Sequence, residues 1–170
     1  ERGAWALGGL LFLWQIPHFH ALAAVARADY AAGGLKMLAV TNPSCNAQWA
    51  KLTSAAMIPV GAAFVSCDLT SDIFGWEAAV LGAWMYRGAA RMSAAPASAR
   101  AARPLFKASI VHLPVTMLLM MAHKLTPAER ARREASNQRR DRAYLDRQQD
   151  MNPIRIYHPW ETLAPFPFLP

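Results

Sequence analysis

Three long stretches without a charged side chain constrain this chain more than any other feature. Residues 4–26, 52–67 and 108–123 contain no Asp, Glu, Lys or Arg. A helix needs about 20 mainly apolar residues to cross the roughly 30 Å hydrocarbon core of a bilayer. The first stretch has that length alone, and apolar neighbours extend the other two. We therefore expect an all-α, polytopic transmembrane helix bundle with four helices in this chain, over residues 4–26, 49–67, 73–92 and 105–123.

A soluble bundle of alanine-rich buried helices is the alternative, because such helices are also apolar all round. The charges of the connections favour a membrane. Basic residues dominate connections 27–51 and 87–107, whereas the connection near 68–72 carries Asp68 and Asp72. Basic loops lie on the inner side of a membrane. This alternation places the C-terminal tail on the outer side, where its many arginines are unfavourable.

Composition divides the chain into an apolar part, residues 1–124, and a polar tail, residues 125–170. The tail begins with a charged, helix-compatible segment in which Pro127 suits a helix start. It ends in a segment rich in proline and aromatic residues. The net charge is +7, but acids interrupt the basic residues of the tail, so we expect no nucleic-acid partner. Cys45 and Cys67 lack metal-site spacing and are expected to be free thiols.

Polar residues interrupt the first apolar stretch beside a proline. Gln15, His18 and His20 flank Pro17, which removes a backbone hydrogen bond. Polar side chains within a span are costly, so they usually face a cavity or the bundle interior. Residues two apart on a helix are rotated by about 200°, so the two histidines do not suit one shared ion. Hydrogen bonding between helices, with no ligand, is the other interpretation.

Asp29 and Tyr30 follow the end of this first helix, and Gly33, Gly34 and Lys36 come next. A carboxylate near cations at the mouth of a membrane helix suits a phosphate held through Mg²⁺, which prefers oxygen ligands. A charged loop end without any ligand has the same residues. The residue pattern alone therefore leaves both interpretations open.

Two segments resemble a known family. The first is "LFLWQIPHFHALAAVARADYAAGGLKMLAVTNP", residues 11–43, and the second is "ARPLFKASIVHLPVTMLLMMAHK", residues 102–124. They are similar to the protoheme farnesyltransferases, or heme O synthases, which are intramembrane prenyltransferases, and to their mitochondrial branch in particular. The pattern W-Q-x-P-H-F followed by D-Y-x-x-x-G and a methionine is carried by Trp14, Gln15, Pro17, His18, Phe19, Asp29, Tyr30, Gly34 and Met37.

The resemblance implies a nine-helix enzyme that transfers the farnesyl group of farnesyl diphosphate to a vinyl group of heme B. The product is heme O, the precursor of the heme A of cytochrome c oxidase. It further implies Mg²⁺ as cofactor, held at Asp29 through the diphosphate. Asp29, Tyr30 and His18 would be catalytic, and Trp14, Gln15, Arg27 and Lys36 would bind substrate.

One departure from the family concerns its first motif, N-x-x-x-D-x-x-x-D, which does not occur in these 170 residues. We therefore expect the chain to be the C-terminal portion of the enzyme and to be inactive alone. The alternative is a non-catalytic heme-binding assembly factor of the membrane, using His18 or His112, or an inactive fragment. The expected location is the mitochondrial inner membrane, crossed several times, or the bacterial inner membrane in a prokaryote. The lipid bilayer, and heme A synthase or oxidase assembly factors, are the expected partners.

Overall fold

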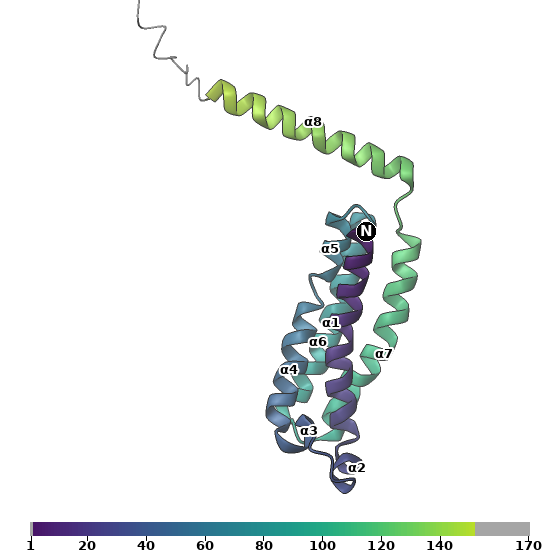
Figure 1. Ribbon diagram of the computed structural model, residues 1–170, viewed down its shortest axis with the longest axis vertical. Coiled ribbons are helices and arrows are strands. Elements are labelled where there is room, and N and C mark those ends of the chain that lie inside the picture. The colour runs from purple at the N-terminus through teal and green to yellow at the C-terminus, as the bar shows by residue number, and fades with distance from the viewer. Residues whose placement is uncertain (1, 152–170) are drawn as a thin grey trace, which may run out of the picture. The chain divides into compact units, whose positions relative to one another are not determined.

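The computed structural model describes residues 2–151, and over these residues it is all-α, as the sequence predicts (Figure 1). The proline-rich and aromatic segment predicted at the C-terminal end lies outside the described residues. The helices are α1 (Arg2–Val25), α2 (Arg27–Ala32), α3 (Leu38–Thr41), α4 (Pro43–Ala56), α5 (Val60–Ser66), α6 (Asp72–Ala94), α7 (Ala99–Ala122) and α8 (Pro127–Met151).

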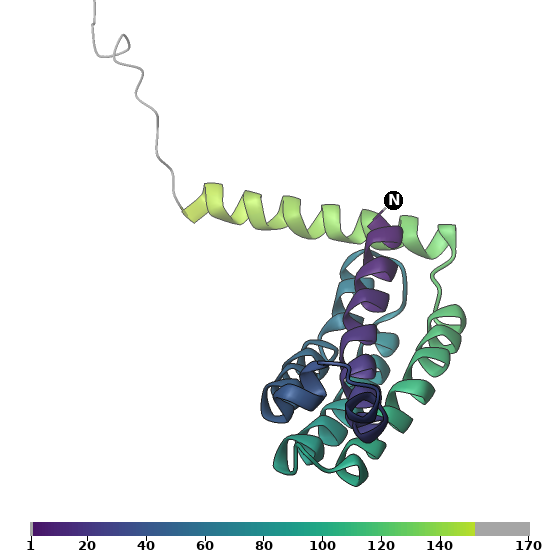
Figure 2. The same ribbon diagram turned by 60° about the horizontal axis from the view of Figure 1, so that its bottom comes forward.

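Four of these elements form an elongated bundle. α1 packs against α4 and α7, and α6 packs against the same two helices, so α1 and α6 occupy opposite corners (Figures 1 and 2). α5 continues the direction of α4 and lies against α6. The short helices α2 and α3 lie together at one end of the bundle. The first compact unit of the chain is Glu1–Arg130, and α8 belongs mainly to a second unit, Ala131–Pro170.

The predicted spans are found with one interruption. α1 and α6 match the expected helices closely, whereas α7 begins at Ala99, before Pro104, because Ser98 caps it by accepting a hydrogen bond from the Ala101 N–H. The expected span 49–67 is broken after Ala56 and resumes at Val60. Pro59 lies in the break and has no N–H to continue the ladder. The second span is therefore two helices instead of one.

The surface of the bundle supports a membrane setting. The segments Gly3–Val25 and Ala99–Ala122 are long and apolar enough to cross a bilayer. Large apolar side chains also point outward, with Trp5 84%, Trp76 78% and Met121 73% exposed. Exposed apolar surface of this extent suits hydrocarbon better than water. The chain is thus an all-α membrane bundle, and the soluble alternative is disfavoured.

Close helix contacts in the bundle rely on glycine. A Cβ added to Gly82 of α6 would lie 2.9 Å from the backbone of Ile58. A Cβ added to Gly88 would lie 2.8 Å from the Cα of Leu105 on α7. Small residues allow helix backbones to approach in membrane proteins, where packing replaces the hydrophobic effect between helices. These two glycines therefore fix how closely α6 approaches its neighbours.

A short backbone clip joins two loops at the end of the bundle away from α2. Ser71 N–H donates to the His123 carbonyl at 3.0 Å, and Leu125 N–H donates to the Leu69 carbonyl at 3.1 Å. The His123 ring lies between Ser71 Oγ, at 3.1 Å, and Glu77 Oε2, at 3.0 Å. The clip places the end of α7 beside the acidic connection 67–71, and both lie opposite the basic connections.

α8 begins with a capping box. Thr126 N–H and Oγ1 donate to Glu129 Oε2 at 2.8 and 2.7 Å, and Glu129 N–H donates back to Thr126 Oγ1 at 3.3 Å. Pro127 occupies the first helical position, where its missing N–H costs nothing. The predicted helix start is thereby confirmed.

Candidate active site

The polar residues of α1 lie on two different sides of the helix. Trp14 and His18 face α7, whereas Gln15 and His20 face α3 and α4. The rotation of about 200° between His18 and His20 predicted this separation. The histidines therefore belong to two separate local environments.

His18 is fixed by Ser109 of α7. Its Nδ1 lies 2.9 Å from Ser109 Oγ, which in turn donates to the Phe106 carbonyl at 2.7 Å. The Ser109 hydroxyl has one proton, which it gives to the carbonyl. His18 Nδ1 must therefore donate the hydrogen bond to Ser109 Oγ. The other ring nitrogen, Nε2, then carries the lone pair, because the bond made by one nitrogen sets the state of the other.

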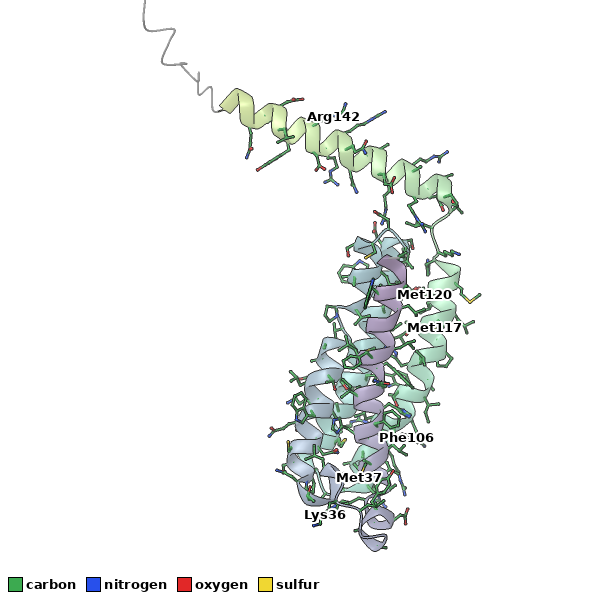
Figure 3. All side chains as sticks on the ribbon, viewed as in Figure 1. Lys36, Met37, Phe106, Met117, Met120 and Arg142 are labelled. Carbon is green, nitrogen blue, oxygen red and sulfur yellow. The ribbon has the colours of Figure 1, made fainter. Side chains whose placement is uncertain are left out.

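Aromatic rings hold His18 from both faces. Its ring stacks on Trp14, with centroids 4.8 Å apart and an interplanar angle of 18°, and on Phe106, with centroids 5.4 Å apart. Trp14 Nε1 also donates to the Ser109 carbonyl at 2.8 Å. Figure 3 shows Phe106 on α7 within the bundle. His18 is thus a rigidly positioned imidazole at the contact of α1 and α7.

The other side of α1 borders an open cavity of about 370 Å³. Gln15, Phe19 and His20 line it from α1, Asn46 lines it from α4, and residues 37–39 close it from the connection that contains α3. The lining is mainly apolar with a few polar groups, the usual composition of a small-molecule site. Of the polar residues expected to share a cavity, the structure brings Gln15 and His20 together here.

Asn46 is a site residue that the sequence did not reveal. Its Nδ2 donates to the His20 carbonyl at 3.0 Å, and its Oδ1 lies 2.7 Å from His20 Nδ1. Because the carbonyl fixes the amide orientation, Oδ1 must accept and His20 Nδ1 must donate. In the neutral form of the ring, His20 Nε2 is then an acceptor on a residue that lines the cavity. Asn46 is one of several polar residues in α4, so no signal in the sequence singled it out.

Asp29 and Tyr30 lie on α2, at the end of the bundle. Gly33 N–H bonds to the Asp29 carbonyl and Leu35 N–H to the Tyr30 carbonyl, both at 2.9 Å. These bonds end α2, and Gly34 adopts a positive φ of 71°, a conformation that favours glycine. The turn sends the chain back to Met37 at the cavity, and Figure 3 shows Lys36 and Met37 at this end.

The charged groups at this end are accessible. The side chains of Asp29 and Lys36 are exposed and that of Tyr30 is half-buried. Arg27 Nη1 donates to the Ala97 carbonyl at 3.3 Å, which ties α2 to the connection between α6 and α7. Within the residues that the structure describes, no three His, Cys, Asp or Glu side chains gather in one place. Asp29 therefore supplies a single carboxylate at this end of the bundle, whereas Mg²⁺ in proteins is held by one or two carboxylates together with water and phosphate oxygens.

The fold and this site define a class: an all-α intramembrane protein with an apolar cavity beside one polar end. Comparison with known proteins narrows it. The chain is 38% identical over 122 residues to the mitochondrial protoheme IX farnesyltransferase of Gibberella zeae, covering 72% of this chain and 24% of that protein. The human mitochondrial protein is 36% identical over 124 residues, covering 73% and 28%, and that of the bacterium Opitutus terrae 37% over 123 residues, covering 71% and 42%. The matching part of this chain belongs to the protoheme IX farnesyltransferase family.

The resemblance read from the two segments is thereby confirmed. The chain spans about a quarter of the length of the first curated relatives it matches. No family model matches the chain, and no solved structure matches it.

Proposed function

We propose that this chain supplies one polar end and part of the substrate cavity of a protoheme IX farnesyltransferase. The complete protein would transfer the farnesyl group of farnesyl diphosphate to a vinyl group of heme B, giving heme O. The observation that carries this proposal is the sequence identity of 36–39% to curated members of that name. The arrangement of Asp29, the apolar cavity and the two imidazoles supports it.

Asp29 and its neighbours would hold the diphosphate. Asp29 would bind Mg²⁺ through one carboxylate, while Arg27 and Lys36 would offset the remaining negative charge, and Tyr30 would donate a hydrogen bond. Mg²⁺ bound there would stabilise the charge that develops on the leaving diphosphate. The other ligands of the ion would come from water, phosphate oxygens and the part of the relatives that this chain does not cover.

The cavity would hold the apolar parts of the substrates. The bond between farnesyl C1 and the diphosphate oxygen breaks, the electron pair leaves with the diphosphate, and the vinyl π electrons form the new carbon–carbon bond. The former vinyl group then carries the positive charge, which is discharged when water adds to that carbon and gives up a proton. Gln15 and His20 line the space where a polar group is needed to orient a substrate, and His20 Nε2 is an acceptor there. Trp14 positions His18, whose own Nε2 would accept a proton or contact heme from the α7 side.

The setting that follows is the inner mitochondrial membrane, crossed several times, with the basic connections on the matrix side. The first six relatives are all named as mitochondrial. Heme A synthase or oxidase assembly factors are the proposed partners, since they would receive the product.

The non-catalytic alternative relies on His18 or His112 as a heme ligand. His112 is 2% exposed and lies beside Thr116, which argues against access to heme.

Asp29→Asn tests the proposal, because it keeps the volume and removes the charge. The chain would replace the matching part of the Gibberella zeae relative, and the fusion would be expressed in a host without its own heme O synthase. Loss of one electrostatic group in an active site costs about 10²-fold or more in rate. We expect a loss of that size in heme O formed per unit of folded protein.

Asp68→Asn is the matched control, since it makes the same chemical change at the opposite end of the bundle. Its turnover should stay within about twofold of the unaltered fusion, because charges separated by more than a screening length of about 10 Å interact weakly. Equal turnover of Asp29→Asn and the unaltered fusion would remove Asp29 from the site.

A further inference from the structure

A second polar pocket lies at the seam of α6 and α7. It has a volume of about 240 Å³ and is lined by Trp84, Arg87, Gly88, Arg91 and Pro104. α1 and α6 occupy opposite corners of the bundle, so this seam faces away from the one between α1 and α4 that holds the substrate cavity. The pocket is smaller than the roughly 300–1,000 Å³ of sites that enclose a drug-sized ligand. It suits a small charged group.

The two arginines of this pocket have no partner among the described residues. Arg87 and Arg91 are exposed, and neither guanidinium makes a hydrogen bond or an ion pair within residues 2–151. They lie four positions apart on one helix, an arrangement in which like charges repel each other. No acid occurs between residues 78 and 128. An anion bound between them would remove this repulsion.

The position of the pocket indicates which kind of anion would bind there. It lies near the end of α6 that carries the basic connection to α7, where a matrix or cytoplasmic membrane surface is expected. Trp84 is 44% exposed and lies one helical turn before Arg87, on the side of the helix middle. Tryptophan is enriched at the headgroup level of membranes. Arginine binds phosphate through two parallel hydrogen bonds. Basic pockets between membrane helices on this side bind anionic lipid headgroups.

We propose that Trp84, Arg87 and Arg91 form a binding site for the phosphate of an anionic phospholipid, separate from the substrate cavity. Pro104 and Gly88 close its floor, because Gly88 brings α6 against Leu105 of α7. The site depends only on the membrane setting of the bundle and does not depend on the proposed catalytic function. The lipid headgroup would neutralise the two arginines and hold the seam of α6 and α7 at the membrane surface.

The test is binding of phosphatidylglycerol to the purified full chain in detergent, counted by native mass spectrometry. Phosphatidylcholine with the same acyl chains is the uncharged comparison, and inorganic phosphate is the soluble one. Each arginine near a lipid surface contributes about fivefold to affinity, so Arg87→Gln with Arg91→Gln should weaken phosphatidylglycerol binding by at least tenfold. Binding of phosphatidylcholine should not change.

Arg100→Gln with Arg103→Gln is the matched control, because it removes two exposed charges at the same end outside the pocket. It should weaken phosphatidylglycerol binding by less than about threefold, because these two arginines would attract the headgroup only through screened, long-range electrostatics. Arg87→Lys with Arg91→Lys keeps the charge and the fold, and should weaken binding through loss of the paired hydrogen bonds. The proposal would be overturned if the two glutamine pairs weakened binding equally, or if millimolar phosphate displaced the lipid. If the Arg87→Gln, Arg91→Gln protein misfolds, unchanged lipid binding by the lysine pair would overturn it instead.

Discussion

At the scale of single residues, Asn46 links α1 and α4 most directly. It is 1% exposed, and its amide donates to the His20 carbonyl and accepts from the His20 ring. Hydrogen bonds between helices in membranes contribute about 0.6 kcal/mol each, but a buried donor left without its partner costs about 1–3 kcal/mol. Most of the cost of removing Asn46 therefore comes from leaving the His20 Nδ1–H without an acceptor. Asn46 fixes the tautomer of a cavity residue as well as the helix contact.

Asn46→Leu should lower the free energy of unfolding by about 2 kcal/mol, because the side chain keeps its size and both hydrogen bonds are lost. Unfolding in mixed detergent, followed by circular dichroism, measures this change. Gln48→Leu is the control, since Gln48 is an exposed residue on the same helix, and it should change stability by less than about 0.5 kcal/mol. Equal effects of the two substitutions would contradict the role assigned to Asn46.

At the same scale, the sequence predicted the separation of His18 and His20 but not their partners. Helix geometry alone sets the angle between two residues of α1. The partners Ser109 and Asn46 lie 91 and 26 positions away, and which helix approaches which face depends on packing. The site roles of Gln15, Asp29, Tyr30, Arg27 and Lys36 remain predictions. Gln15 lines the cavity, Arg27, Asp29 and Tyr30 lie on α2, and Lys36 lies between α2 and α3.

At the scale of elements, α6 depends on the absence of side chains at its contacts. Gly82→Ala would place a methyl group 2.9 Å from the Ile58 backbone, which cannot move aside as a side chain could. Overpacking of this kind costs about 1–3 kcal/mol. Unfolding in mixed detergent should show that loss. Gly8→Ala, where an added Cβ meets nothing within 4 Å, should instead be neutral or stabilise the protein by up to about 1 kcal/mol of helix propensity. A stable Gly82→Ala protein would contradict the requirement for a close approach of α6 to the Ile58 backbone.

The elements also show where hydropathy stops being informative. Charge-free stretches located α1 and α7 because length and apolarity are what a span requires. The break at residues 57–59 lies inside an equally apolar stretch, so hydropathy gives no sign of it. The early start of α7 was missed because proline usually breaks a helix, whereas Pro104 lies inside a helix that begins after the Ser98 cap. Helix caps and interruptions of a helix are set by local hydrogen bonds, which the average hydropathy of a stretch does not reveal.

At the scale of the whole molecule, the membrane setting is the first point to test. Alkaline carbonate removes proteins that adhere to a membrane by charge and leaves proteins that span it. With two helices apolar enough to cross a bilayer and exposed tryptophans on the bundle, the chain should stay in the pellet. A tagged mitochondrial matrix protein serves as the released control. Recovery of the chain with that control would contradict a membrane bundle.

The most direct test of the central claim is heme O itself. Membranes from a host lacking its own heme O synthase would be extracted and their hemes separated, for the chain alone and for the fusion in which it replaces the matching part of the Gibberella zeae relative. Because the chain covers 24% of that relative, we predict heme O from the fusion and none from the chain alone. A fusion that inserts and folds like the relative, yet makes no heme O, would contradict the assignment. Heme O from the chain alone would contradict the expectation that it is a portion of the enzyme.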